Sequence, residues 1–291
     1  MRTREQKSID DADTTWCSCV SVFFINFMFI TIINDCRDEN TMGRQATRVA
    51  QLFGSGISVT TVGIGWSELE GAGNLIDMLD ASNGEKGIIL VNVAPRHGRG
   101  KKWPNGTPFG YFYYKKTLII STIAEQCLSL VKKFGLADSI SLTDVPTVVD
   151  EMIKQGKLDS SLRDRIVKSQ FRSFDYMPRL AKWLIDEEAI PHEKYHISNV
   201  IEAPKAVWWV DNFGNCKTTI LPEDIDYQSG KILATKVGDI MCYEHLKDVP
   251  NGEAGLTIGS SGLDDKRFIE LVVQGESAAQ RFGLKPGDTI I

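Results

Sequence analysis

The sequence predicts an α/β N-terminal domain with a mostly parallel sheet, followed by a smaller antiparallel β domain that resembles a barrel. In the first part, apolar strand-like runs alternate with amphipathic segments in a β-α-β-α-β order, which is typical of a parallel sheet. After about residue 204, short strands follow one another with Gly, Pro, Asp or Asn turns between them. We therefore expect an extension over 1–25, the α/β domain over 26–197 and the β domain over 204–291.

The N-terminal elements follow in order from the apolar pattern. Strand-like runs rich in β-branched residues lie at 28–33 and 57–62, and an unbroken apolar run at 87–94 is typical of a central parallel strand. Helical segments with one apolar face lie between them at 41–53 and 68–81. Ligands of parallel sheets gather at the carboxyl ends of the strands, which makes candidates of the polar and aromatic residues Asp35, Trp66 and Asn92.

The remaining elements are also predicted from pattern. A basic loop over 96–110 precedes a stretch with strand character at 111–122. Helices are expected at 128–134, 144–154, 160–167 and 177–188. In the β domain, the expected strands are 206–210, 216–221, 231–236, 239–243, 254–259 and 268–273.

Composition bounds the function. The net charge of -5 argues against a general nucleic-acid binder, which would show a basic face. The apolar run 20–33 is shorter than the roughly 20 residues that cross a bilayer, so no membrane role is expected. The six cysteines have no zinc-like spacing, and the pair His192 and His196 lacks an acidic partner. We expect reduced thiols, a cytoplasmic location and no metal.

A polar stretch, Asp211–Asn215 (D-N-F-G-N), lies between two apolar strands and reads as a tight turn. Its bulky Phe213 needs a core or a ligand to pack against. With Asp211 and Asn215 beside the ring, the turn suits a nucleoside or an amino-acid head group, but a plain hairpin with Phe213 capping a core fits equally well. Ser277 is a candidate N-cap of a short helix, where exposed N–H groups can receive a polar ligand edge.

Common catalytic signatures are missing from the sequence. It contains no G-x-G-x-x-G after a strand, no Walker loop, no H-E-x-x-H and no G-x-S-x-G. The residues by themselves therefore predict a two-domain protein with a polar and aromatic site for an unspecified ligand.

Four ordered segments add a resemblance. Residues 211–220 resemble the D-x-F-G-N-x-x-T-N-I motif of the S-adenosylmethionine (SAM) hydroxide adenosyltransferases, which are adenosine-forming hydrolases, and of the related fluorinase and chlorinase. The segments 248–253, 260–262 and 276–288 are similar to the family's D-V-P-x-G, N-S-x-G and G-S-A-A-x-x-L-G-L-K-x-G-D. The N-terminal half matches more loosely, with Asn34-Asp35-Cys36 at the family's T-D-F and Phe171-Arg172-Ser173 at its F-H-G or F-Y-S.

The resemblance implies a reaction and an assembly. The nucleophile attacks C5′ of SAM and methionine leaves, so SAM is the small-molecule substrate and no cofactor is needed. Hydroxide transfer, which makes the protein a SAM hydrolase, is the first expectation. A SAM-dependent halogenase and a non-catalytic SAM or adenosine binder are the alternatives. The family also implies a homotrimer, with each site between the N-terminal domain of one subunit and the C-terminal domain of the next.

The resemblance also implies roles for individual residues. Asp35 would accept hydrogen bonds from the ribose hydroxyls, and Trp66 would lie near the ribose or methionine. Ser173 would sit beside C5′ and the nucleophile. Phe171 and Phe213 would form walls beside the ligand, and Asp211 would accept the methionine ammonium. Asn215 would hydrogen-bond the adenine edge or the head group, and backbone groups near Ser277 and Ala279 would read adenine.

Two positions depart from the hydrolase pattern. The family carboxylate of V-D-P-G-V-G is Asn92 here, and the histidine of F-H-G-R-D is Arg172. Asn92 cannot act as a base and Arg172 stays protonated. Arg96, His97 or Lys102 is a candidate replacement, whereas Arg172 near the nucleophile and the match of Ser173 to F-Y-S favour an anion over water. The catalytic candidates are therefore Asn92, Arg96, Arg172 and Ser173.

Overall fold

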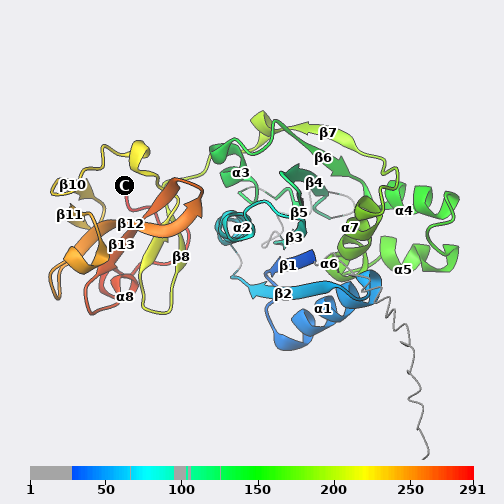
Figure 1. The fold of residues 1–291 in the computed structure, drawn as a ribbon, viewed down its shortest axis with the longest axis horizontal. Helices are drawn as coiled ribbons and strands as arrows, with labels where there is room; N and C mark the ends of the chain where they lie inside the picture. The colour runs from blue at the N-terminus through cyan, green and yellow to red at the C-terminus, as the bar shows by residue number, and fades with distance from the viewer. Residues whose placement is uncertain (1–27, 66, 95–102, 104–105, 125) are drawn as a thin grey trace, which may run out of the picture.

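The computed structural model describes residues 28–65, 67–94, 103, 106–124 and 126–291. The chain forms two lobes, each built on one sheet (Figure 1). The N-terminal lobe carries strands β1 to β7, and the C-terminal lobe carries strands β8 to β13 and the last helix.

The sheet of the N-terminal lobe has seven strands in the order β2-β1-β3-β5-β4-β6-β7. Three neighbouring pairs, β1–β2, β1–β3 and β3–β5, are parallel, whereas β4–β5, β4–β6 and β6–β7 are antiparallel. The sheet is therefore mixed, and the expectation of a mostly parallel sheet is correct only for its first four strands. The bounds are β1 (Met28–Asn34), β2 (Ile57–Gly63), β3 (Gly87–Asn92), β4 (Phe109–Tyr114), β5 (Thr117–Thr122), β6 (Ser139–Thr143) and β7 (Glu193–His196).

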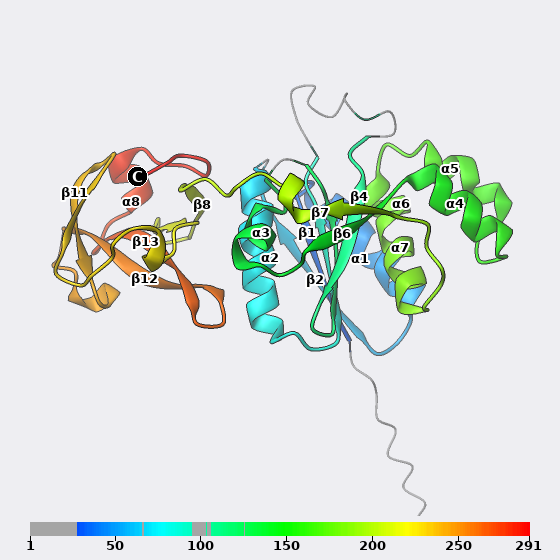
Figure 2. The same cartoon turned by 90° about the horizontal axis from the view of Figure 1, so that it is seen from above.

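Helices cover both faces of this sheet (Figure 2). Alternate side chains of β1 and β3 divide between two cores: Ile33 and Val91 pack on the side of α2 and α3, whereas Ile32 and Leu90 pack on the side of α1, α4 and α7. This two-sided burial explains why every residue of β3 is buried and why its sequence is an unbroken apolar run. The helices are α1 (Glu39–Phe53), α2 (Glu68–Ser82), α3 (Ser129–Phe134), α4 (Val145–Lys154), α5 (Arg163–Val167), α6 (Arg172–Asp175) and α7 (Met177–Ile185).

Side-chain caps fix the starts of several helices. Asp38, Ser67 and Asp144 accept hydrogen bonds from the first-turn N–H groups of α1, α2 and α4. These caps place α1 and α2 immediately after the strands β1 and β2, so that both helices begin at the edge where the strands end. The candidate site residues of the N-terminal lobe lie at this edge.

The stretch 111–122, for which we expected strand character, belongs to a β-hairpin. β4 and β5 are antiparallel and pair Tyr114 with Thr117, with Lys115 at the turn in a left-handed conformation, φ +52°. A lysine pair in place of Gly, Asn or Asp conceals this turn in the sequence. The short strands β6 and β7 were not expected either, because their segments carry several polar or charged residues.

The sheet of the C-terminal lobe has six strands in the order β10-β11-β12-β13-β9-β8. All neighbouring pairs are antiparallel except β11–β12. Within the described residues β10 and β8 are end strands that do not pair with each other, so the sheet is open, and the barrel-like closure that we expected is not formed. The elements are β8 (Val207–Val210), β9 (Cys216–Thr218), β10 (Ile232–Thr235), β11 (Gly238–Tyr243), β12 (Ala254–Leu263), β13 (Lys266–Val273) and α8 (Ala278–Phe282).

Helix α2 joins the two lobes. The carboxylate of Asp77 accepts hydrogen bonds from Ser261 Oγ (2.8 Å) and Gly262 N (3.1 Å), both on β12. Asp80, one turn further along α2, pairs with Arg267 at 2.7 Å. The S-S-G segment 260–262, one of the four that carried the family resemblance, therefore fixes how the lobes pack within one chain.

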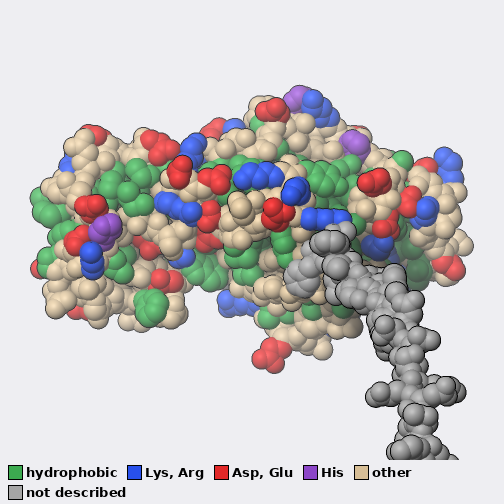
Figure 3. Space-filling view, in the orientation of Figure 1, with side chains coloured by type: hydrophobic (Ala, Val, Ile, Leu, Met, Phe, Trp, Pro, Cys, Tyr) green, Lys and Arg blue, Asp and Glu red, His purple; other side chains and the backbone are tan. Residues whose placement is uncertain are grey.

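Acidic and basic side chains are interspersed over the face shown in Figure 3, in line with the net charge of -5. In the part of the chain that the structure describes, no helix has both the length and the apolar character needed to cross a bilayer.

Candidate functional site

Polar side chains gather where β1 and β3 end. The two strands are parallel neighbours with Asn34 opposite Asn92 in register, so the residues that follow them share one edge of the sheet. Asp35, the first residue after β1, donates its N–H to the carbonyl of Asn92 at 3.2 Å. Asn34, Asp35 and Asn92 are all buried.

A chain of side-chain hydrogen bonds runs from these strand ends to Ser173. Asn92 Nδ2 donates to Asn34 Oδ1 (2.9 Å), and Asn34 Nδ2 donates to Gln45 Oε1 on α1 (2.8 Å). Gln45 Nε2 then donates to Ser173 Oγ at 2.8 Å. Ser173 is 5% exposed, and Asn34 and Gln45 are fully buried. Because the hydrogen bonds link the four elements β3, β1, α1 and α6 inside the fold, they hold Ser173 in one position relative to Asp35.

The carboxylate of Asp35 is also held in place. One of its oxygens, Oδ2, accepts the N–H of Ala94 at 3.0 Å, across the gap between the ends of β1 and β3. A carboxylate in this position presents acceptor capacity at the sheet edge where ligands of α/β folds bind.

The neighbours of Ser173 on α6 point in other directions. The ring of Phe171 stacks on Phe174 (centroids 5.3 Å apart) with the guanidinium of Arg44 at 5.1 Å. The guanidinium of Arg172 lies 5.3 Å from the ring of Phe109 on β4, and burial lowers its pKa. Its Nη1 has no hydrogen-bond partner among the described residues. No contact of the described chain brings Arg172 to Asp35 or Asn92.

In the C-terminal lobe, Asp211 builds the turn between β8 and β9. Its Oδ1 accepts the N–H groups of Phe213 and Asn215, both at 2.9 Å, and its Oδ2 accepts Asn215 Nδ2 at 3.0 Å. The backbone of Asp211 adds a hydrogen bond from its N–H to the carbonyl of Asn215 (3.1 Å). The carboxylate keeps capacity for a further donor, since two oxygens offer about four acceptor positions.

This turn and the start of α8 form one unit. Gly214 has φ +83°, and a Cβ there would lie 2.0 Å from Ser277 Oγ, so only glycine fits. The carbonyl of Gly214 accepts the N–H of Ala279 at 2.9 Å, while Ser277 Oγ accepts the N–H of Gln280 as the N-cap of α8. The N–H of Ala279 is thus used inside the fold rather than offered to a ligand.

A cavity of about 470 Å³ opens beside this unit, between the turn, the end of β13 and the start of α8. Phe213 lines it and is 72% exposed, so the alternative in which this ring caps a core is wrong. An exposed aromatic ring beside amide and hydroxyl groups is suited to stacking against a flat heterocycle. The full lining is Phe213, Asn215, Leu246, Val273, Gln274, Gly275, Glu276 and Ser277.

The structure therefore divides the candidate residues into two groups. Asp35, Asn92 and Ser173 are joined by the hydrogen bonds of the N-terminal lobe, whereas Asp211 to Asn215, Ser277 and Ala279 meet in the C-terminal lobe. Each residue that lines the C-terminal cavity comes from that lobe. Trp66 and Arg96 lie outside the described residues.

Sequence reasoning missed Asn34 and Gln45, which connect Asn92 to Ser173. A signal for Gln45 was present, because it lies four residues before the buried Val49 on the same face of α1. A long amide on the buried face of a helix requires a hydrogen-bond partner, and that requirement points to a polar network.

Comparisons with known proteins agree with the C-terminal half of this description. Residues 205–291 match the family model of the SAM hydroxide adenosyltransferase C-terminal domain, which confirms the resemblance found in the motifs. A solved structure, described as the crystal structure of an uncharacterized conserved protein from Thermotoga maritima, is similar with a TM-score of 0.63 and 16% identity. The similarity covers 89% of this chain and 97% of that one, and at this identity it supports the fold alone. No curated protein matches the sequence.

Proposed function

We propose, from the match of residues 205–291 to the family model of the SAM hydroxide adenosyltransferase C-terminal domain, that the protein is an adenosine-forming SAM hydrolase. The observation that carries the proposal is the exposed ring of Phe213, which lines a cavity together with Asn215 and Ser277 inside the matched range. The adenine of SAM stacks on this ring, and the amide and hydroxyl groups beside it read the edge of the base.

The N-terminal lobe supplies the groups that face the ribose. Asp35 accepts hydrogen bonds from the 2′- and 3′-hydroxyls, and Ser173 lies beside C5′. This assignment is supported by the buried chain of amides that positions Ser173 relative to the end of β1. A site fixed on strand ends and a helix is suited to holding a nucleophile in line with the bond that breaks.

The reaction is a substitution at C5′. The oxygen of water attacks C5′, the C5′–S bond breaks, and its electron pair neutralises the sulfonium to give methionine. The oxygen then loses a proton to solvent, which gives adenosine. Because the sulfonium already activates the carbon, orientation and partial dehydration of the water contribute more than a strong base, and Asn92 in place of a carboxylate is compatible with this chemistry.

Ser173 can orient the water. A serine hydroxyl has one donor and two acceptor positions, and Gln45 uses one of the acceptor positions. The remaining lone pair accepts a hydrogen bond from the water, which leaves an oxygen lone pair of the water free to face C5′.

We further propose that the two halves of the site come from different copies of the chain in a homotrimer. Among the described residues of one chain, the lobes meet through α2, which packs against β8 and β12, and through α3, where Lys133 pairs with Asp224 and Phe134 packs on Phe268. The described residues that line the C-terminal cavity all belong to the C-terminal lobe. An assembly that brings the C-terminal cavity of one copy to the strand ends of the next would complete the site.

Halide transfer is the second candidate. Asn92 and Arg172 replace the carboxylate and the histidine of the hydrolase pattern, and the proton of the Ser173 hydroxyl can be donated to an anion. A non-catalytic SAM binder is the third reading, since the altered positions remove the family's water-orienting groups.

The deciding experiment is to incubate the purified protein with SAM in ¹⁸O-labelled water, with and without chloride, and to identify the products by mass spectrometry. The hydrolase reading requires methionine and adenosine with ¹⁸O at the 5′ position in both samples. Formation of 5′-chloro-5′-deoxyadenosine would establish the halogenase reading instead. Intact SAM that binds without turnover would overturn both enzymatic readings.

A further inference from the structure

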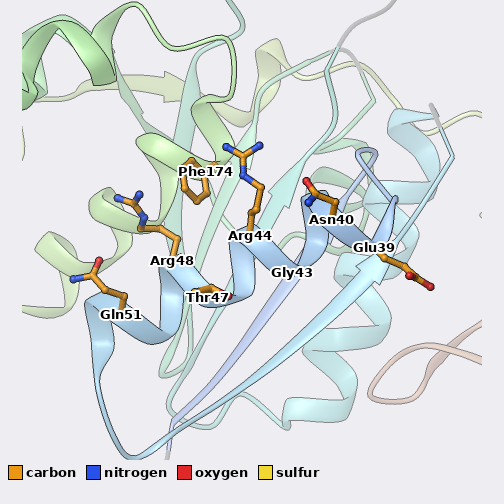
Figure 4. A pocket seen from close by; sticks show the side chains of 8 residues that line it. All are labelled: Glu39, Asn40, Gly43, Arg44, Thr47, Arg48, Gln51 and Phe174. Atoms are coloured by element: carbon orange, nitrogen blue, oxygen red, sulfur yellow. The ribbon is translucent and has the colours of Figure 1, made fainter.

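A second cavity lies along one side of α1, and its described lining comes from α1, together with Phe174 of α6 (Figure 4). Its volume is about 600 Å³. Arg44 and Arg48, one turn apart on the helix, extend on the same side as Phe174 from α6. The remaining lining residues provide amide, hydroxyl and carboxylate groups: Glu39, Asn40, Gly43, Thr47 and Gln51.

The two arginines are held on an aromatic surface. The guanidinium of Arg44 lies 4.8 Å and that of Arg48 4.4 Å from the centre of the Phe174 ring. Phe174 is itself stacked on Phe171 at 5.3 Å. Cation–π contacts fix the guanidinium groups without using their N–H donors, so these donors remain available to a ligand in the cavity.

Carboxylates do not neutralise this charge in the described chain. Neither Arg44 nor Arg48 has a carboxylate of the described residues within salt-bridge distance, and Figure 4 shows the Glu39 side chain directed away from them. Like charges at positions i and i+4 of a helix repel each other. Such a pair costs stability unless an anion lies between or above the two groups.

A third arginine adds to the positive charge. Arg179 of α7 is buried and donates Nη1 to the carbonyl of Asp175 at 2.7 Å. Burial lowers the pKa of Arg179, and the charges of Arg48 and Arg165 lower it further. Asp175 offers one compensating carboxylate, which Arg165 approaches at 3.7 Å. Arg179 thus experiences the charges of Arg48 and Arg165, and the carboxylate of Asp175 opposes them.

We propose that this cavity is a second ligand site, and that it binds a small molecule through a phosphoryl group held by Arg44 and Arg48. Each guanidinium offers a planar fork of N–H donors that matches phosphate oxygens. A phosphoryl group carries a charge of about −1.5 to −2 at neutral pH, and a dianion compensates two guanidinium groups better than a single carboxylate does. The cavity is larger than phosphate itself, which leaves room for an organic substituent beside Asn40 and Gln51.

The proposed site adjoins the SAM site without being part of it. Phe174 follows Ser173 in α6, and Arg44 precedes Gln45, whose side chain donates to Ser173 Oγ. On α1, Gln45 is buried towards the sheet whereas Arg44 is exposed. The exposed Arg44 on α1 thus faces away from the buried contact between Gln45 and Ser173, so phosphoryl binding can be measured without SAM.

The test is calorimetric titration of the full-length protein with inorganic phosphate, with sodium chloride added to match ionic strength. We expect one saturable site, and we expect Arg44→Gln/Arg48→Gln to weaken phosphate binding by about tenfold or more. Glutamine keeps a high helix propensity, so this double variant should retain α1. The matched control is Lys116→Gln/Arg163→Gln, which removes two exposed cations elsewhere and should bind phosphate as the parent protein does.

Two further measurements can overturn the proposal: the binding of succinate, and the binding of phosphate by a lysine double variant. Succinate that binds as tightly as phosphate would overturn the phosphoryl assignment. Full phosphate affinity in Arg44→Lys/Arg48→Lys, which keeps the charge but removes the planar forks, would overturn the role of the two guanidinium groups. Equal phosphate affinity in the parent protein and the glutamine double variant would place any binding elsewhere. The lysine variant also provides the decisive comparison if the glutamine variant does not fold.

Discussion

Phe213 is a large aromatic residue with 72% of its surface exposed in the middle of a rigid turn. The turn does not need the ring, because the hydrogen bonds of Asp211 and the conformation of Gly214 define the turn without it. The ring therefore contributes little to folding, and its exposure is understandable if it serves as a surface for a ligand.

Phe213→Ala should separate binding from stability. We expect the free energy of unfolding to change by less than about 0.5 kcal/mol, as for an exposed side chain, and SAM binding to weaken by about 1–3 kcal/mol through lost stacking. Urea unfolding and calorimetry measure the two quantities. A large loss of stability with unchanged affinity for SAM would assign Phe213 to the fold rather than to the site.

Asp35→Ala should weaken binding of adenosine by about 1–3 kcal/mol, because two ribose hydroxyls lose their acceptor. Calorimetry with adenosine isolates this effect from contacts to methionine. Asp144→Ala is a useful control, since it removes a helix-capping carboxylate of the same lobe from α4. Unchanged adenosine affinity in a folded Asp35→Ala protein would exclude Asp35 from the site.

The sequence predicts the position of a site residue only where the residue lies at the end of a predicted strand or in a predicted turn. Asp35 follows a strand, Asn92 ends one, and Asp211 to Asn215 form a turn, so their positions could be inferred from the strand pattern and from turn chemistry. The direction of a side chain could not be inferred from the sequence. Arg172 and Ser173 are neighbours in the chain, yet Ser173 accepts a hydrogen bond from Gln45 whereas Arg172 lies against Phe109. That choice depends on packing between α6, α1 and β4.

At the scale of elements, α2 has two packing partners. One face contributes to the core of the N-terminal sheet, and another contacts β8 and β12 of the C-terminal lobe. Gly73 lets the indole of Trp208 approach the helix, because a Cβ at this position would lie 2.2 Å from the ring. A glycine in the middle of a helix thus has a packing role here.

Gly73→Ala should destabilise the protein by about 1–3 kcal/mol, since overpacking against Trp208 outweighs the gain of about 1 kcal/mol in helix propensity. Gly43→Ala on α1 is the matched control, because a Cβ there meets nothing within 4 Å. We expect this second change to stabilise the protein by about 0.5–1 kcal/mol. Equal effects of the two substitutions in denaturant unfolding would contradict the contact between α2 and Trp208.

Periodicity predicted most elements but not how they pair. The helices α1, α2 and α4 and the six strands of the C-terminal lobe lie close to their expected ranges. The hairpin β4–β5 was missed because Lys115 and Lys116 form its turn, and the open form of the second sheet was missed because closure depends on contacts between strands distant in sequence. Local sequence carries little information about either feature.

At the scale of the whole molecule, each described residue that lines the C-terminal cavity belongs to the C-terminal lobe, and none belongs to the group around Asp35 and Ser173. The contacts between the lobes include those of α2 with β8 and β12, the hydrogen bonds that Asp77 accepts from Ser261 and Gly262, and the ion pair of Lys133 on α3 with Asp224. If the proposed site requires both groups, a second copy of the chain must supply one of them, and an isolated monomer should bind SAM weakly and turn it over slowly.

Co-expression of Asp35→Ala chains with Phe213→Ala chains tests this assembly. Each variant alone should have little SAM hydrolase activity, because every site then contains one damaged half. In a random equal mixture, about a quarter of the sites combine the intact N-terminal half of a Phe213→Ala chain with the intact C-terminal half of an Asp35→Ala chain. Activity should therefore rise to about a quarter of the parent level, measured as adenosine released per chain. If both halves came from the same chain, no mixed site would be intact, and the co-expressed sample would be no more active than the average of the two variants.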